Sequence, residues 1–296
     1  MASRDIRDQA GLSGRKVRKL NFIKASTSYR FRKYYRSGLR SHIFEVLDPR
    51  AVDQEQTGVM EDGIRVFPRA TPLKIFRIFR NRFSSTEEIF DEIQRYKVLL
   101  KYLGPGFIAR SEEFIADYRD SPEASGILLC GLQEYVEGQI LDPWRLCGGK
   151  SIRGLLSVMA PPGDVEALTR TAVENICCFT QRIRHLAAQA GYIPDLAGVG
   201  NLILTPDGGI RLVDINNIVV LQQGEHIPLD DKGYPACDVS VQVLFLIEQN
   251  LLGCPEKQPD PLFGAFLTPE RRERVRQIEK NFYTRLGKDN DPVDAY

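Results

Sequence analysis

Residues 192–204 read Tyr192-Ile-Pro-Asp-Leu-Ala-Gly-Val-Gly-Asn-Leu-Ile-Leu204, and the turn Pro206-Asp-Gly-Gly209 and the run Arg211-Leu-Val-Asp214 follow. Asp-Gly between two apolar runs is a strong hairpin signal. The segment thus offers Asp195, then Asn201, then Asp214 beyond a hairpin. Carboxylate and amide oxygens suit Mg²⁺, which takes one or two protein groups together with phosphate oxygens. The remaining carboxylate can accept the proton of an attacking hydroxyl.

The part of the chain before residue 138 predicts a sheet with one helix. Runs rich in β-branched and aromatic residues occur at 42–47, 63–67, 73–79, 107–116 and 127–136, and we expect the first three to be strands of one antiparallel sheet. Ser84 and Ser85 stand three residues before Glu87 and Glu88, which is the spacing of a capping box. The helix that this signal begins should end at Gly104.

Helical patterns dominate the part of the chain after residue 138. Apolar residues recur at helical spacing from Val165 to Leu186, and further helices are expected near 239–252 and 269–285. We therefore predict an α+β fold of two lobes. The N-lobe covers residues 26–137 and is an antiparallel sheet plus one helix, and the C-lobe covers residues 138–296 and is mostly helical.

The N-terminus is strongly basic. Residues 1–40 contain twelve Lys or Arg and two acids, so they carry +10, and the rest of the chain carries −9 by subtraction from the net +1. We expect residues 1–25 to be a flexible basic arm. Nucleic acid, an anionic membrane surface, an acidic partner and the protein's own acidic body are its possible targets, and a merely solvated tail is the plain alternative.

Several classes of protein are disfavoured by the sequence. Its six cysteines form no C-x-x-C pair, and no Cys/His spacing suits zinc, so free thiols in a reducing compartment are expected. The basic N-terminus lacks the apolar core of a signal peptide, and no apolar run approaches the roughly 18–20 residues of a membrane span. We expect a cytoplasmic protein without an integral membrane segment, with peripheral membrane attachment left open.

The same residues resemble the protein-kinase-like superfamily. The stretch from Asp195 to Asp214 is similar to its catalytic loop, hairpin and metal-binding Asp, whose signatures read H-R-D-x-x-x-x-N and D-F-G. Leu132-Gln-Glu-Tyr-Val-Glu-Gly138 looks like its hinge, and the helix beginning near Asp238 looks like its D-x-x-S helix. The order of elements matches from about residue 40 to the end, which implies the family's fold.

The resemblance implies ATP and Mg²⁺ as cofactors and a role for each matching residue. Asp195 would be the catalytic base, Asn201 and Asp214 would hold magnesium, and Glu134 and Val136 would offer backbone groups to adenine. Lys74, in Pro72-Leu-Lys-Ile-Phe76, would bind the phosphates and pair with Glu92. Arg77 is a rival for the role of Lys74, and Glu88 is a rival for that of Glu92.

The sequence also departs from the family's pattern. The Asp195–Asn201 gap is one residue longer, Ile193-Pro194 replaces His-Arg, Ala197 stands where many members have Lys, and no G-x-G-x-x-G precedes Lys74. These departures argue against a standard protein kinase. We expect a divergent, bacterial-type phosphotransferase that acts on a hydroxyl of a sugar, a lipid-linked sugar or a protein. The alternatives are a pseudokinase that binds a nucleotide or a partner without turnover, and a polar surface loop of no catalytic importance.

Overall fold

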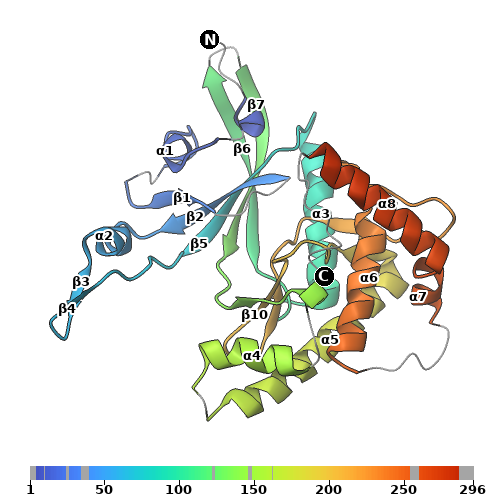
Figure 1. Ribbon diagram of the computed structural model, residues 1–296. Helices are drawn as coiled ribbons and strands as arrows, with labels where there is room; N and C mark the ends of the chain where they lie inside the picture. The colour runs from blue at the N-terminus through green and yellow to red at the C-terminus, as the bar shows by residue number, and fades with distance from the viewer. Residues whose placement is uncertain are drawn as a thin grey trace. The chain divides into compact units, whose positions relative to one another are not determined.

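The computed structural model describes residues 5–9, 11–24, 27–34, 40–121, 124–145, 149–161, 163–253 and 260–286 (Figure 1). The chain is a mixture of helices and antiparallel sheets, so the α+β class is confirmed. It divides into two compact units, of which unit 1 comprises Met1–Gln94 with Arg110–Tyr135 and unit 2 comprises Arg95–Ala109 with Val136–Tyr296. The chain passes from unit 1 to unit 2 between Tyr135 and Val136, two residues before the expected end of the N-lobe.

A five-stranded antiparallel sheet forms the centre of unit 1 (Figure 1). Its strands in spatial order are β1 (Arg30–Lys33), β2 (Ser41–Leu47), β5 (Lys74–Phe79), β7 (Ala124–Glu134) and β6 (Ser111–Ser121). The expected strands at 42–47 and 73–79 are therefore neighbours in one sheet, where Ser41 pairs with Phe79 and Val46 with Lys74.

The expected strand at 63–67 does not join this sheet. Residues between β2 and β5 form α2 (Pro49–Thr57) and a separate hairpin of β3 (Val59–Glu61) and β4 (Ile64–Val66). Asp62 and Gly63 both have positive φ, of 48° and 81°, and so make a tight local turn. Ile64 and Phe67 are 67% and 61% exposed, so this run lacks the buried face that would hold it in a larger sheet.

The N-terminal segment is folded, which corrects the expectation of a flexible arm wherever its residues are described. It contains a 3₁₀ turn, η1 (Ile6–Asp8), and the short helix α1 (Gly14–Val17). Ile6, Leu12 and Val17 are at most 1% exposed and share a cluster with apolar side chains of β2, β5, β6 and β7. Positive charge in the sequence suggested a solvated tail, but apolar residues among the charges bury their side chains against the sheet.

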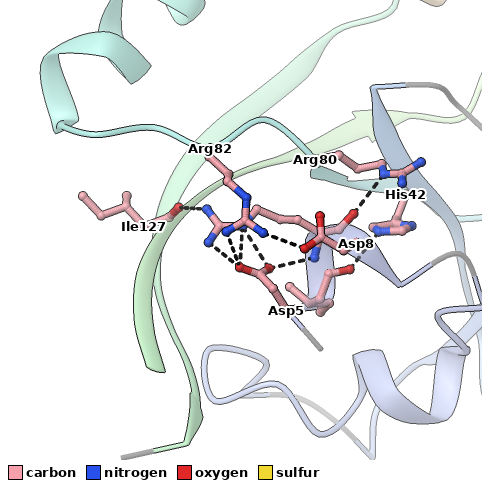
Figure 2. Close-up of polar contacts among 8 residues, drawn as sticks. Asp5, Asp8, His42, Arg80, Arg82 and Ile127 are labelled. Atoms are coloured by element: carbon pink, nitrogen blue, oxygen red, sulfur yellow. Dashed lines mark hydrogen bonds and ion pairs between the residues drawn. The ribbon is translucent and has the colours of Figure 1, made fainter. Parts of the chain in front are cut away.

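Ion pairs fasten the same segment to unit 1 (Figure 2). The Asp5 carboxylate accepts hydrogen bonds from Nε and Nη2 of Arg7, at 2.9 and 2.6 Å, and from Nη1 of Arg82 at 3.0 Å. Nη2 of Arg82 also reaches Asp8 at 2.6 Å. The hydrogen bonds from Arg7, followed by the charges of Arg7 and Arg82, lower the pKa of Asp5 to about 2 against the opposing effect of burial.

Backbone carbonyls complete the attachment seen in Figure 2. Nε of Arg80 donates to the carbonyl oxygen of Arg7 at 2.9 Å, and Nε2 of His42 lies 2.9 Å from that of Ile6. Burial, and then the charge of Arg80, lower the pKa of His42. Because His42 comes from β2 and Arg80 directly follows β5, η1 is held from two neighbouring strands.

The helix expected after Ser84 is α3 (Thr86–Leu103). Its predicted capping residues are in use, since Ser85 Oγ accepts from the Glu88 N–H at 3.4 Å and the Glu88 carboxylate accepts from the Ser84 N–H at 2.7 Å. Ile89 packs with Phe79 on the sheet of unit 1. Residues from Arg95 onward belong to unit 2, so the helix is not a part of the N-lobe alone as the sequence suggested.

Unit 2 is mostly helical (Figure 1). Its helices are α4 (Gly149–Met159), α5 (Val165–Ala190), α6 (Ala236–Asn250), α7 (Pro261–Phe266) and α8 (Pro269–Arg285), together with the turn η2 (Pro143–Arg145). The expected stripe of α5 is fully buried from Ile176 to Leu186 at helical spacing. Among the described residues no helix is long and apolar enough to cross a membrane.

Two small antiparallel sheets lie in unit 2. β10 (Leu202–Leu204) pairs with both β11 (Ile210–Leu212) and β8 (Gln139–Ile140), which confirms the predicted hairpin at Asp207-Gly208. β9 (Tyr192–Pro194) pairs with β12 (Ile218–Val220). The strand before Asp195 (β9) is thus paired with the strand after Asp214 (β12). The strand that follows the Asp195 loop (β10) is paired with the strand before Asp214 (β11).

The docking of the N-terminal segment predicts a stability difference between two Ile→Ala changes. Ile6→Ala should lower the free energy of unfolding by about 2–5 kcal/mol, because it opens a cavity in a packed cluster. The matched change Ile64→Ala, at an exposed site of the same unit, should cost less than about 0.5 kcal/mol. Urea unfolding followed by circular dichroism measures both, and equal effects would mean that Ile6 is not docked.

The pKa of Asp5 predicts a pH dependence. A folded-state pKa near 2 lies below the ordinary value of 3.8, so the stabilisation from Asp5 is present above pH 4 and is lost as the pH falls toward 2. Asp5→Asn should therefore reduce stability by up to about 1 kcal/mol at pH 6, since such pairs are partly exposed, and by less at pH 3. Asp53→Asn, an exposed carboxylate of α2, serves as control, and a difference from wild type that does not shrink toward pH 3 contradicts the assignment.

Candidate functional site

The Asp195 carboxylate is held on both of its oxygens. Asp195 follows β9, and its N–H donates to the carbonyl of Asn217 at 2.7 Å as an extension of the β9–β12 pairing. Its Oδ1 accepts from the Ala197 N–H at 2.9 Å, and its Oδ2 accepts from Nδ2 of Asn217. Leu196 N–H in turn donates to Oγ of buried Ser240 on α6 at 3.1 Å. The loop that carries Asp195 is therefore anchored to a strand and to a helix.

Asn201 ties the end of this loop back to its start. Its Nδ2 donates to the carbonyl oxygen of Asp195 at 3.1 Å, and its N–H donates to the carbonyl of Gly198 at 2.9 Å. A Cβ on Gly198 would stand only 2.6 Å from Oδ1 of Asn201, so the close approach requires glycine. The longer gap between Asp195 and Asn201 is accommodated by this turn.

Asp214 is placed beside Asn201 by the predicted hairpin. The Val213 N–H donates to the carbonyl oxygen of Asn201 at 2.8 Å, and Asp214 is the next residue. Its carboxylate is half-buried and makes no hydrogen bond or ion pair within the described part of unit 2. The structure therefore brings Asp195, Asn201 and Asp214 together in one unit, through two hydrogen bonds.

The donor set at this place fits a magnesium–phosphate complex. Asn201 uses its Nδ2 toward Asp195, which leaves Oδ1 as an oxygen ligand, and Asp214 offers a carboxylate. No group of three or more His, Cys, Asp and Glu in the described ranges is arranged around a metal ion. Asn201 and Asp214 would thus bind a metal only together with oxygens of water or phosphate, as Mg²⁺ prefers.

In unit 1, the structure places Lys74 and the helix that carries Glu92 on different faces of the sheet. Lys74 lies on the same face of β5 as Phe76 and Ile78, whose side chains face the docked N-terminal segment. α3 packs on the other face of the sheet, where Phe79 meets Ile89. Because side chains alternate along a strand, Lys74 points away from the helix that carries Glu92. The structure therefore does not bring Lys74 and Glu92 to one face of the sheet, and their ion pair stays a prediction.

Arg77 lies on the helix-covered face but has another partner. Its Nη2 donates to Oε1 of Glu113 on β6 at 2.7 Å, and both side chains are at most 6% exposed. Both residues stand opposite Gly131 of the intervening β7, where a Cβ would lie 2.7 Å from Glu113 Oε2. The missing side chain at 131 lets the ion pair reach across the strand.

The two residues predicted to contact adenine, Glu134 and Val136, differ in what their backbones can offer. The Glu134 N–H already donates to the carbonyl of Arg110 at 2.9 Å, and its carboxylate accepts from the N–H and Nε of Arg110 at 3.0 and 2.9 Å. The backbone N–H of Glu134 is therefore already engaged and is not available to adenine. Val136, the first residue of unit 2 after the passage, is half-buried, and its role toward adenine stays a prediction.

Asn217 is the site residue that the sequence did not identify. It supplies both the carbonyl that receives the Asp195 N–H and the amide that holds Oδ2 of Asp195. The pair Asn216-Asn217 after Asp214 was a visible signal, but only the register of β9 and β12 shows which Asn faces Asp195.

Two tyrosines lie near the Asp195 loop. Tyr234 packs in one apolar cluster with Ala197, and its hydroxyl donates to Oε1 of Glu279 at 2.7 Å. Burial raises the pKa of Tyr234 well above its usual value, and the charges of Glu279 and Asp195 act in the same direction. Burial is also the main cause that raises the pKa of Tyr283. Tyr234 is thus a hydrogen-bond donor at neutral pH.

The support given by Asn217 can be tested by stability. Asn217→Ala should lower the free energy of unfolding by about 1–3 kcal/mol, because it removes the buried amide that donates to the Asp195 carboxylate. Gln223→Ala, at an exposed position of the loop that follows, should change it by less than about 0.5 kcal/mol. Urea unfolding of both variants decides the matter, and equal costs would remove Asn217 from the site.

The sequence was compared with known proteins. No protein-family model matches the chain. No curated protein matches it at a significant level.

Proposed function

We propose that the protein is a kinase-like phosphotransferase that moves the γ-phosphoryl group of ATP, bound with Mg²⁺, to a hydroxyl. The observation that carries the proposal is the hydrogen-bonded arrangement of Asp195, Asn201 and the segment Val213–Asp214 in unit 2. These residue types, in this order and with this pairing, offer a base and two hard oxygen ligands at one place.

Each residue has one task in this proposal. Asp214 and Oδ1 of Asn201 would hold the metal, which neutralises charge on the phosphate oxygens. Asp195 orients the acceptor and takes its proton while the acceptor oxygen forms a bond to phosphorus and the bond to the ADP oxygen breaks. The hydrogen bonds from Ala197 and Asn217 keep the Asp195 carboxylate in one orientation. Catalysis would come mainly from positioning and charge neutralisation.

Lys74 remains the candidate for a phosphate-binding cation in this proposal. Its ammonium takes part in no ion pair of the described residues, whereas the charge of Arg77 is neutralised by Glu113. Val136 remains the candidate for a backbone contact to adenine. The acceptor would be a hydroxyl of a sugar, a lipid-linked sugar or a protein.

A binding module without turnover is the second candidate function. It is favoured by the state of Asp195, whose two carboxylate oxygens both accept hydrogen bonds from the protein itself. A carboxylate engaged in this way also serves simply to stiffen the loop. Such a pseudokinase would bind nucleotide, or a partner protein, through the same unit.

Calorimetric titration with Mg-ATP tests the proposal. Wild type should bind, and Asp214→Asn should weaken binding by at least about tenfold through loss of a metal ligand. Asp231→Asn, an exposed carboxylate of unit 2, should bind like wild type. Absence of binding by wild type, or equal binding by the Asp214 and Asp231 variants, would exclude this nucleotide site.

Turnover separates the two candidate functions. An enzyme should release ADP from ATP in the presence of its acceptor, and Asp195→Ala should lose that release while still binding Mg-ATP. Binding without ADP release over a panel of sugar and protein acceptors would favour the binding module.

A further inference from the structure

The basic N-terminal region plays no part in the proposed phosphotransfer. Between Asp8 and Glu45 the sequence contains ten Lys or Arg and no acidic residue over 36 positions. A run of this length without a carboxylate cannot neutralise its own charges locally. The structure of this run therefore determines whether its charges lie on a flexible tail or on a folded surface.

The described part of this run is a folded surface of unit 1. α1 lies against the edge strand β1, and a Cβ on Gly14 would stand 1.7 Å from the carbonyl oxygen of Phe31, so the contact is too close for any residue but glycine. The side-chain amide of Asn21 donates to the carbonyl of Asp117 at 2.6 Å, and its oxygen accepts from the Arg119 N–H at 3.3 Å. The segment 11–24 is thus fastened at both ends to the sheet.

Four cations project from this segment into solvent. Arg15, Lys16, Lys19 and Lys24 are exposed, and none forms an ion pair in the described part of the chain. Lys16 and Lys24 contact only neutral oxygens, at Gln9 and at the carbonyl of Asn21. Arg32 shows the contrast, because it is neutralised by Glu45 and Glu55. The four exposed charges remain available to an outside anion.

The apolar side chains of the same segment point the other way. Leu12 and Val17 are at most 1% exposed, and Leu20, Phe22 and Ile23 pack against the same core cluster. A membrane-binding segment needs apolar side chains that enter the bilayer, or a lipid anchor, in addition to its cations. This surface offers cations without apolar side chains, as a partner made of regularly spaced phosphates requires.

We propose that the surface formed by Arg15, Lys16, Lys19 and Lys24 binds the phosphate backbone of a nucleic acid. Binding would be independent of base sequence, because four cations on one short segment contact phosphates rather than base edges. Since the backbone of the segment is already folded, only the ordering of the four side chains opposes the contact. The surface belongs to unit 1, and its binding does not depend on the proposed phosphotransfer.

Fluorescence anisotropy of a labelled 30-base-pair DNA duplex and of a 30-nucleotide RNA tests this proposal with the full chain. Affinity of wild type should fall roughly a hundredfold between 50 and 200 mM NaCl, as expected for about four phosphate contacts. The variant R15Q/K16Q/K19Q/K24Q should bind at least tenfold more weakly at 50 mM and should lose most of this salt dependence. Substitution is preferable to deletion of residues 1–40, which would also remove β1 and the buried Ile6, Leu12 and Val17.

The control removes four exposed cations of α8 in the variant R272Q/R274Q/R276Q/K280Q. It should bind nucleic acid like wild type, which separates this surface from net charge. Equal losses in both variants, or no binding of either probe by wild type, would overturn the proposal. Binding only to vesicles of 70% phosphatidylcholine and 30% phosphatidylserine would overturn it in favour of a lipid surface. Thermal unfolding of both variants verifies that they are folded.

Discussion

The side-chain amide of Asn201 fixes the geometry on which the candidate site depends. By donating to the carbonyl of Asp195, it closes a loop whose two ends belong to different small sheets, β9–β12 and β8–β10–β11. The loop can close only because Gly198 has no side chain where Oδ1 of Asn201 passes. Asn201 also positions Asp214, because the N–H of the neighbouring Val213 donates to the carbonyl oxygen of Asn201.

The hydrogen bonds that hold the Asp195 loop bear on both proposed functions. The hydrogen bonds from Ala197 and Asn217 hold the Asp195 carboxylate in one orientation, and pre-organisation of this kind would serve the proposed phosphoryl transfer. The same hydrogen bonds take up one lone-pair position on each carboxylate oxygen, so an acceptor hydroxyl would use a remaining position. Asn217 contributes to the orientation of Asp195 under either proposed function, because its carbonyl and its side-chain amide both contact Asp195.

Unit 1 is organised by the need to cover both faces of one sheet. α3 covers one face through Ile89, and the N-terminal segment covers the other through Ile6 and its neighbours. The basic residues of that segment consequently stand on a fixed scaffold, and Arg15, Lys16, Lys19 and Lys24 are exposed and form no ion pair within the described part of the chain. On the helix side, the absence of a side chain at Gly131 allows a buried pair of Arg77 and Glu113.

Local patterns predicted the elements that depend on neighbours in the chain. The capped start of α3, the apolar stripe of α5, the strands β2 and β5 and the hairpin after Leu204 follow from periodicity and turn residues, and all are present. The order Asp195, Asn201, Asp214 was also readable. These features could be recognised because hydrogen bonds and burial within a few residues determine them.

Other features required contacts between distant residues. The face on which Lys74 lies, the partner of Arg77, the contacts of Asn217 and the docking of residues 5–9 and 11–24 depend on strand register and on which apolar side chains meet. A shift of one residue in register moves every side chain to the opposite face, and composition alone does not define that register. Local sequence patterns therefore predict the secondary structure and the order of the candidate site residues. Which side chains contact one another is determined only by tertiary packing.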